Sequence, residues 1–344
     1  MPTYLDCNIP YTLVFPDVDI KGKTALIQLP DGMKQFSLQI TKCVKERFSI
    51  DSIISIENTY GACDLQYNQI FKIIKPDLIM HIGHSPYPEY LASKSVNPDN
   101  RNWQIIYVKA LSKLQLTEEI IDKASELLKE KSLRTISIAL TSQHTHLYSF
   151  LYNELEKRGF KVKKSNGFQP YYEPGQILGC DFRASIFRDS EGYVFLGGGE
   201  FHPLGLYLAT LKPVIQIDLY SNRVVDFTPI GYKYYKQRLF KVSQAMDANH
   251  WGIIIGLKTG QYRPYIINII IKMLKGKDYV LLLAENINEL SLRSIDNDWF
   301  DAFAITSCPR IPIDDLLYYD KPILTPGEAY MALNKKLDRY LFPW

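Results

Sequence analysis

Three short stretches, each holding one cysteine, constrain this chain more than any other feature of its sequence. They cover residues 60–64, 178–182 and 306–310, and their cysteines are Cys63, Cys180 and Cys308. Each stretch follows or ends an apolar run typical of a buried strand. Cys63 and Cys180 are 117 positions apart, and Cys180 and Cys308 are 128 positions apart. Two nearly equal steps predict three similar units, each of which brings one thiolate to a shared centre.

The size and composition of the chain fit an ordinary globular protein with two or three domains. It has 344 residues, of which 46% are hydrophobic and 22% charged. No apolar run approaches the roughly 20 residues of a membrane span. The first residues lack the basic start and apolar core of a secretory signal. We therefore expect a cytoplasmic protein that does not bind a membrane.

Charge and cysteine content narrow the expectation further. A net charge of +3, without a cluster of five Lys or Arg residues, does not indicate direct binding of nucleic acid. Five cysteines, an odd number, argue against a disulfide framework and for reduced thiols. Cys43 lies on the apolar face of an expected helix and Cys7 lies near the start of the chain. We interpret both as non-functional.

The order of apolar runs, loops and helical patterns predicts an α/β protein of three similar domains. The proposed boundaries are 1–112, 113–240 and 241–344. Continuous apolar strands that alternate with amphipathic helices are typical of small, mainly parallel sheets flanked by helices. The strands are expected at 24–29, 52–56, 77–82, 104–108, 134–140, around 162, 193–196, 213–219, 252–257, 279–284, 302–306 and 322–324. The helices are expected at 33–48, 64–74, 117–131, 147–158, 263–274 and within 221–250.

The position of the three cysteines after strands favours a ligand site over a core role. In parallel sheets, ligands bind at the carboxyl ends of the strands. A buried cysteine taken alone is more often a small hydrophobic residue. Gly61, Gly179 and Pro309 lie beside the cysteines, and glycines let the backbone approach a bulky inorganic centre. Because no Cys-x-x-Cys pair exists, an iron–sulfur cluster with one open iron is favoured over zinc, though only modestly.

The loops after the first strand of each unit offer polar groups that we expect to converge on one small molecule. They provide Asp31 with Gly32, then Gln143 with His144, and then Lys258, Gly260 and Gln261. The molecule would carry amino, carboxylate and ribose groups. Capping of helix N-termini is the alternative role for these residues.

Three further loops are candidates for cofactor binding. The glycines at 197–199 end a strand and precede His202 at the start of a helix, where exposed amides bind carboxylate or phosphate; a tight turn is the alternative. His81 lies two residues before Gly83 at a strand end, and His84 follows that glycine. Arg310 follows Cys308, and Asp314 and Asp315 are placed to orient it or to start a helix.

Five signature stretches together resemble the archaeal diphthamide synthase family, the 2-(3-amino-3-carboxypropyl)histidine synthases. The likeness covers nearly the whole chain in order. The stretches are Tyr60-Gly61-Ala62-Cys63, Leu178-Gly179-Cys180-Asp181, the run from Gly197 to Gly205, Lys258-Thr259-Gly260-Gln261, and the run from Cys308 to Asp315.

The resemblance implies a homodimer of three-domain subunits, each a triangle around a central [4Fe–4S] cluster held by Cys63, Cys180 and Cys308. It also implies that S-adenosyl-L-methionine binds the open iron and that an external donor supplies one electron. A 3-amino-3-carboxypropyl radical would then add to the imidazole carbon of a histidine of translation elongation factor 2. This is the first step of diphthamide biosynthesis.

Two other functions stay open from the residues alone. The chain could be a non-catalytic iron–sulfur or zinc partner subunit of such an enzyme. It could also be a nucleotide-dependent transferase that uses the glycine run for phosphate and buries its cysteines in the core.

Overall fold

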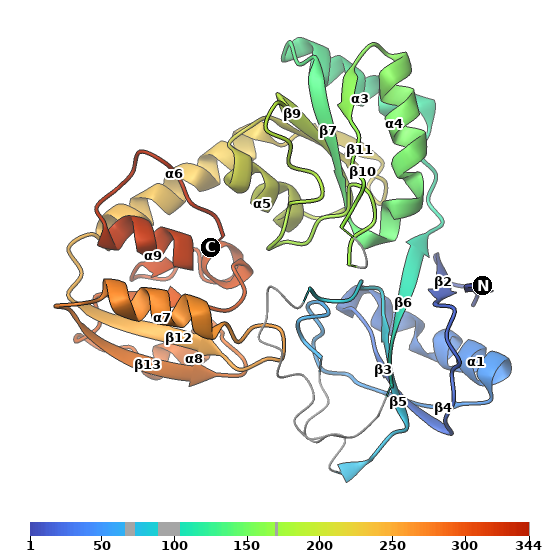
Figure 1. The fold of residues 1–344 in the computed structure, drawn as a ribbon, viewed down its shortest axis with the longest axis horizontal. Helices are drawn as coiled ribbons and strands as arrows, with labels where there is room; N and C mark the ends of the chain where they lie inside the picture. Colours follow the sequence, from blue (N-terminus) through green and yellow to red (C-terminus); the bar gives the residue numbers. More distant parts are fainter. Residues whose placement is uncertain (66–72, 89–103, 169–170, 344) are drawn as a thin grey trace.

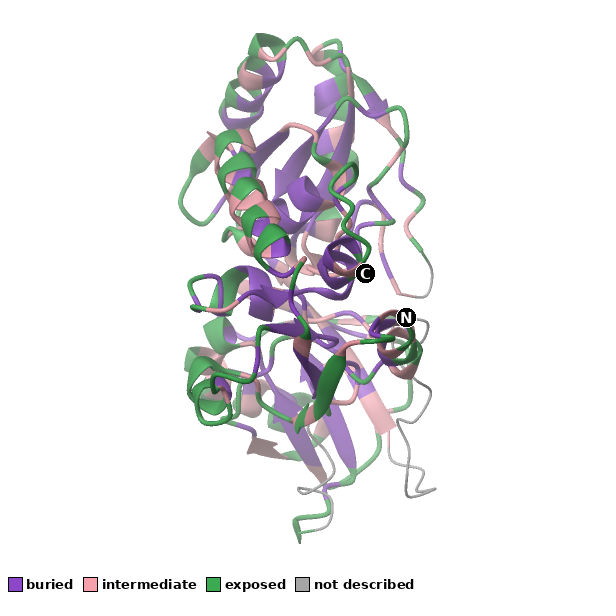
Figure 2. Ribbon diagram, turned by 90° about the vertical axis from the view of Figure 1, so that its left-hand side faces the viewer, coloured by how far each residue is buried: buried purple, intermediate pink, exposed green. Residues whose placement is uncertain are grey.

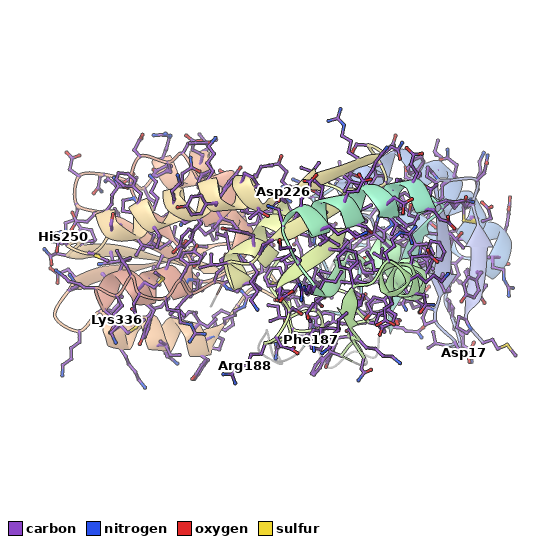
Figure 3. The ribbon with its side chains drawn as sticks, turned by 90° about the horizontal axis from the view of Figure 1, so that it is seen from above. Asp17, Phe187, Arg188, Asp226, His250 and Lys336 are labelled. Carbon is purple, nitrogen blue, oxygen red and sulfur yellow. A yellow bond between two sulfur atoms is a disulfide. The ribbon has the colours of Figure 1, made fainter. Side chains whose placement is uncertain are left out.

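The computed structural model of the chain places three lobes at the corners of a triangle (Figure 1). It describes residues 1–65, 73–88, 104–168 and 171–343. Each lobe is built on one mainly parallel sheet flanked by helices, which confirms the predicted fold class. Seen from above, the molecule is flattened, with Asp17 near one end and His250 near the other (Figure 3). None of the helices in the described ranges has the length and apolar character needed to cross a membrane.

The first sheet has six strands in the order β1-β2-β6-β5-β3-β4. Strands β3 to β6 pair in parallel, whereas β1 and β2 form an antiparallel hairpin that extends the sheet next to β6. The sequence reading missed this hairpin. Most of the helix expected at 64–74 lies outside the described residues. The elements are β1 (Thr3–Asp6), β2 (Tyr11–Phe15), β3 (Thr24–Gln28), η1 (Asp31–Phe36), α1 (Ser37–Phe48), β4 (Asp51–Ile54), β5 (Leu78–Ile82) and β6 (Gln104–Ser112).

The second sheet has five strands in the order β11-β10-β9-β7-β8. Only β11 is antiparallel to its neighbour, and it too was missed because it is short and half-exposed. The elements are α3 (Glu118–Glu130), β7 (Thr135–Leu140), η3 (Ser142–Leu147), α4 (Tyr148–Lys157), β8 (Lys161–Lys163), β9 (Gly192–Leu196), α5 (Phe201–Thr210), β10 (Val214–Asp218) and β11 (Arg223–Asp226).

The third sheet has four parallel strands in the order β13-β12-β14-β15. The long helix α6 (Thr228–Gln244) leads from the second lobe into this one, where the sequence predicted a bridging helix (Figure 1). The remaining elements are β12 (His250–Gly256), α7 (Pro264–Met273), β13 (Asp278–Ala284), α8 (Glu289–Arg293), β14 (Ala302–Ile305), η4 (Ile311–Asp315), β15 (Ile323–Leu324) and α9 (Pro326–Leu333).

The apolar cores show that the second and third lobes are joined more closely than the first. Buried strands run through each lobe (Figure 2). One continuous core contains Phe195 and Leu206 of the second lobe together with Trp251 and Ala304 of the third. The main core of the first lobe contains residues of that lobe alone. Burial of shared apolar surface therefore fixes the second lobe against the third.

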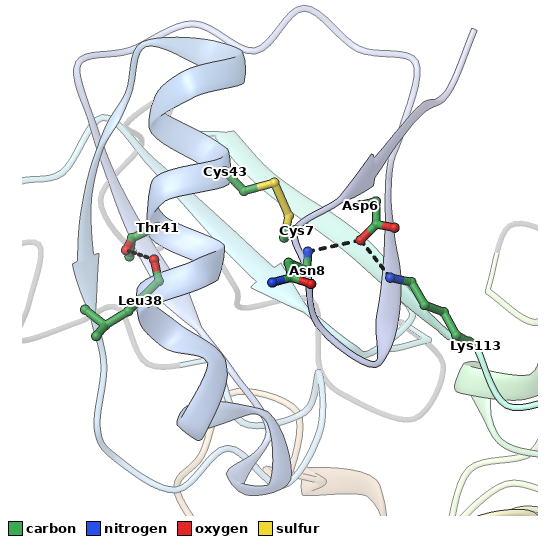
Figure 4. The surroundings of a disulfide bond; sticks show 7 residues. All are labelled: Asp6, Cys7, Asn8, Leu38, Thr41, Cys43 and Lys113. Atoms are coloured by element: carbon green, nitrogen blue, oxygen red, sulfur yellow. Dashed lines mark hydrogen bonds and ion pairs between the residues drawn. A yellow bond between two sulfur atoms is a disulfide. The ribbon is translucent and has the colours of Figure 1, made fainter.

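The expectation that Cys7 and Cys43 are unpaired, reduced residues is wrong. They form a disulfide with a Cα–Cα distance of 5.6 Å, which lies in the range that a disulfide can bridge. Figure 4 shows that Cys43 on α1 faces the turn between β1 and β2, where Cys7 lies. In that turn Asp6 accepts hydrogen bonds from the Asn8 amide and the Lys113 ammonium. The missed hairpin is what brings Cys7 onto the helix.

Candidate metal centre

The three remaining cysteines come from loops of the three different lobes. Cys63 follows β4, Cys180 lies between β8 and β9, and Cys308 follows β14. The Gly260 amide of the third lobe donates a hydrogen bond of 2.8 Å to the Cys63 carbonyl of the first lobe. Because a Cβ on Gly260 would lie 2.5 Å from the Cys63 Cα, only glycine permits this approach. The loops that carry Cys63 and Gly260 are therefore in backbone contact.

A tyrosine and an arginine link this pair of loops to the other two cysteines. The Tyr87 hydroxyl lies 3.9 Å from the Cys180 sulfur and accepts a hydrogen bond of 2.8 Å from Arg263. Arg263 also donates to the Ser307 carbonyl at 2.8 Å, directly before Cys308. Contacts around one arginine thus connect the neighbourhoods of all three cysteines.

Burial and neighbouring charges change the pKa values of the three thiols in the same direction. Burial raises the pKa of the Cys180 thiol to about 12, and the charge of Arg263 opposes this rise. Burial also raises the pKa of Cys63, with the Cys308 and Cys180 charges adding to the effect. The pKa of Cys308 is raised by burial as well, against the Arg310 backbone amide and the Arg263 charge. Bound metal would be needed to hold all three as thiolates at neutral pH.

The donor set fits an iron–sulfur cluster. Each of the three cysteines is half-buried, and none of them is in a disulfide. Within the described ranges, no group of three or more His, Cys, Asp or Glu side chains is arranged to hold a single metal ion. The ligands of a four-iron cluster bind different iron atoms and stand further apart than the ligands of one ion. Three soft thiolate ligands suit such a cluster.

The residues predicted in the three first-strand loops lie in different surroundings. Asp31 is exposed and pairs with Lys34 at 2.6 Å, and Gly32 beside it is exposed as well. Gln143 donates to the Gly83 carbonyl at 3.0 Å, so it joins the second lobe to the first. His144 is fully buried, and its two ring nitrogens have no hydrogen-bond partner among the described residues. Burial lowers the His144 pKa to about 4.

The third first-strand loop lies directly against Cys63. Lys258 forms an ion pair of 2.6 Å with Asp64 and stacks over the Tyr60 ring at 5.0 Å. Gln261 is buried, and its side-chain amide lies 3.8 Å from the Cys63 sulfur. This loop therefore contacts Cys63 through Gln261 and the Gly260 amide, and the neighbouring Asp64 through Lys258.

Three histidines of the predicted loops are shielded from solvent to different degrees: His81 is fully buried, and His84 and His202 are half-buried. His81 has no exposed surface and contacts Gln28 and His84, each at 3.0 Å. Burial lowers the His84 pKa to about 4, and the His202 charge contributes to this shift. His202 stacks on Phe195, and burial lowers its pKa to about 4 as well. These three histidines are therefore neutral at physiological pH.

The glycine run forms a tight, hydrogen-bonded turn before α5. The Gln216 side-chain amide donates to the carbonyls of Gly197 and Gly199, at 3.0 and 2.8 Å. Gly199 has a φ of +73°, which favours glycine, and Gly198 packs close to Tyr220. The turn interpretation therefore describes its local structure.

Arg310 is oriented by the acidic residues that follow it. Its guanidinium lies 2.9 Å from Asp314 and packs over the Phe201 ring at 5.3 Å. Phe201 begins α5 after the glycine run, so Arg310 lies between the second and third lobes.

The sequence reading missed Tyr87 and Arg263, which make the central contacts of the site. Tyr87 lies three residues beyond His84 in the same loop, and Arg263 lies two residues beyond Gln261. Both are next to predicted candidates. Arg263 was assigned to the start of a helix, and its place directly after the Lys258–Gln261 loop was the signal that the sequence offered. In the structure its side chain is only 6% exposed.

Comparison with known proteins identifies the family. The model of the diphthamide synthesis protein family matches residues 29–341. The chain belongs to the diphthamide synthesis protein family. The 2-(3-amino-3-carboxypropyl)histidine synthase of Pyrococcus horikoshii is 32% identical over 317 residues, which cover 92% of this chain and 87% of the relative. The family expected from the sequence is confirmed, and this member of the diphthamide synthesis family is an enzyme.

Solved structures of the diphthamide synthesis family share the fold. The crystal structure of Dph2 from Pyrococcus horikoshii has a TM-score of 0.77 and 31% identity, with 94% of this chain and 89% of that chain covered. A second crystal structure of that protein, described as containing a 4Fe-4S cluster, has a TM-score of 0.77 and 30% identity over the same shares.

Proposed function

We propose that this family member transfers the 3-amino-3-carboxypropyl group of S-adenosyl-L-methionine to the imidazole carbon of a histidine of translation elongation factor 2. The reaction is radical and is the first step of diphthamide biosynthesis. The observation that carries the proposal is the meeting of Cys63, Cys180 and Cys308 from three lobes around one arginine. A crystal structure of Dph2 with a 4Fe-4S cluster shares the fold and supports it.

Cys63, Cys180 and Cys308 hold the [4Fe–4S] cluster in this proposal. When bound, a reduced cluster would supply one electron for cleavage of the bond between the sulfonium sulfur and the aminocarboxypropyl chain. The protein orients the sulfonium so that this bond breaks, and it excludes water and side reactions. The electron comes from an external donor.

The loops around the thiols provide the proposed binding groups for S-adenosyl-L-methionine. Lys258 and Gln261 lie on the Cys63 side, and Arg310 lies between the second and third lobes. Positive charge at Arg310 suits the cofactor carboxylate, and buried amides such as Gln261 suit hydroxyl groups. The remaining proposed residues are Asp31, Gly32, His81, Gln143, His144, Gly197, Gly198, Gly199, His202 and Gly260.

The assembly around the active centre completes the proposal. The enzyme is a cytoplasmic homodimer whose domains are bounded at 1–112, 113–240 and 241–344. Its protein substrate is elongation factor 2, and it uses no nucleic acid and no membrane. The three sheets, which span 3–112, 135–226 and 250–324, each fall within one proposed domain.

Anaerobic reconstitution of the purified protein tests the assignment. We expect about four iron atoms per chain, a dithionite-reducible four-iron paramagnetic signal, and formation of methylthioadenosine from S-adenosyl-L-methionine by the reduced protein. Cys63→Ala, Cys180→Ala and Cys308→Ala are each expected to lose the signal. Cys43→Ser is the matched control: it breaks the Cys7–Cys43 disulfide, but without denaturant the first lobe stays folded and the iron should be kept.

The same experiment decides between this function and the two alternatives. A protein that holds the cluster but produces no methylthioadenosine alone would be the non-catalytic partner subunit. A colourless protein with stoichiometric zinc would be the zinc-bearing form of that partner. A Cys180→Ala variant with unchanged colour and activity would favour the transferase with core cysteines.

A further inference from the structure

Among the residues that the structure describes, each cysteine of the proposed cluster has a hydrogen-bond donor directed at its sulfur. The Gln261 side-chain amide lies 3.8 Å from the Cys63 sulfur, and the Tyr87 hydroxyl lies 3.9 Å from the Cys180 sulfur. The Arg310 backbone amide is the donor to Cys308, and this hydrogen bond lowers the pKa of the thiol. Hydrogen bonds to the cluster sulfurs and nearby charge are the means by which a protein sets the reduction potential of an iron–sulfur centre.

Arg263 holds two of these donors in place. Its Nη1 donates to the Gln261 carbonyl at 3.2 Å and its Nη2 donates to the Tyr87 hydroxyl at 2.8 Å. Because the Tyr87 oxygen accepts from Arg263, its proton is left to point toward the Cys180 sulfur. Further bonds to the carbonyls of Thr306 and Ser307, at 3.2 and 2.8 Å, fix the guanidinium against the loop before Cys308.

We propose that Arg263 and Tyr87 are positioning residues that raise the reduction potential of the cluster, Arg263 through its charge and Tyr87 through its hydrogen bond to Cys180. This inference rests on the proposed function. Reduction adds one electron, taken from an external donor, and so makes the centre more negative. A buried positive charge and a donated proton both stabilise that added charge. Arg263 contacts both the Tyr87 hydroxyl beside Cys180 and the Ser307 carbonyl beside Cys308, and its charge lowers the pKa of each of the three thiols.

Redox titration of the reconstituted protein tests the inference, with iron content measured first. Arg263→Gln is expected to shift the reduction equilibrium at least about tenfold toward the oxidised form, which is 59 mV for a one-electron couple. Tyr87→Phe is expected to shift it in the same direction by less, and Arg263→Lys to recover part of the loss. The potential of the double variant should shift by less than the sum of the two single-variant shifts, because Arg263 orients Tyr87.

Matched controls separate this role from loop anchoring. Arg158→Gln removes an arginine that pairs with Glu154 and Asp122, and Tyr340→Phe removes a buried tyrosine hydroxyl that donates to Glu328. Both variants should leave the potential unchanged. Unshifted potentials in Arg263→Gln and Tyr87→Phe, with iron retained, would overturn the inference. If Arg263→Gln loses its iron, Tyr87→Phe decides alone. A wild-type protein without a cluster would instead overturn the proposed function.

Discussion

At the scale of single residues, the site depends on one backbone contact that glycine alone permits. Gly260 and Cys63 belong to different lobes, yet the Gly260 amide bonds to the Cys63 carbonyl. The neighbouring Gln261 amide and the Lys258–Asp64 ion pair hold the same two loops together. The position of Cys63 is therefore decided by the third lobe as much as by its own.

We predict that Gly260→Ala lowers the iron content of the reconstituted protein. The added Cβ would lie 2.5 Å from the Cys63 Cα, so the two loops must separate, at a cost of about 1–3 kcal/mol. Iron analysis and visible absorption measure the effect. Gly32→Ala is the control, since a Cβ there meets no heavy atom within 4 Å. Equal iron in both variants would contradict the prediction.

A second prediction at this scale concerns pH. Burial lowers the pKa of His84, His144 and His202 from 6.5 to about 4, so between these values the unfolded chain binds protons that the native chain does not. The stability that these neutral histidines provide is complete above pH 6.5 and is lost as the pH falls toward 4. Urea midpoints of the metal-free protein should fall in that window. His144→Gln should make the urea midpoint depend less steeply on pH between 4 and 6.5. An unchanged dependence on pH would count against the prediction.

At the scale of elements, a buried ion pair joins α6 to α9. Arg238 binds Glu328 through two nitrogens, at 2.9 and 2.7 Å, and also donates to the carbonyls of Pro312 and Ile323. Both side chains are almost fully buried. Glu328 also closes the capping box of α9 with Thr325. One charge pair thus fixes the bridging helix against the loop, strand and helix that follow Cys308.

We predict that Arg238→Met destabilises the protein by about 3–5 kcal/mol, because it leaves the Glu328 carboxylate buried without its partner. Urea unfolding measures the change. Arg293→Met is the matched control: Arg293 pairs with Glu289 along the exposed α8, and its loss should leave the free energy of unfolding nearly unchanged. A similar change in the two variants would show that burial does not set the strength of the pair.

At the scale of the whole molecule, the first lobe is the one held mainly by polar contacts. Its core is separate, while the second and third lobes share a core. Contacts such as Gln143 to the Gly83 carbonyl and Gln176 to Ser85 join it to the second lobe. The centre therefore sits where a separate lobe meets a joined pair, and assembly of the cluster depends on that meeting.

We predict that Cys43→Ser destabilises the first lobe alone. The disulfide closes a loop with a sequence separation of 36, for which the chain-entropy relation gives about 3–4 kcal/mol. Hydrogen exchange of the metal-free variant at increasing urea concentration measures the effect. The first lobe should unfold at a lower urea concentration than in the wild type, while the other two lobes keep their midpoint. Reductant should reproduce this shift in the wild type and have no effect on Cys43→Ser. A uniform shift of all three lobes would refute separate unfolding.

The sequence by itself determined the three mainly parallel sheets. Strands that are continuously apolar and alternate with amphipathic helices bury both of their faces under those helices, whichever strands they pair with. It also indicated the three strand-end cysteines and the loops beside them. Only the tertiary structure decided the Cys7–Cys43 disulfide and the β1–β2 hairpin, and only it placed Tyr87 and Arg263 among the thiols. These features arise from contacts between residues far apart in the chain, which local apolar patterns do not encode: Tyr87 and Arg263 are 176 positions apart and meet because three separately patterned lobes pack together.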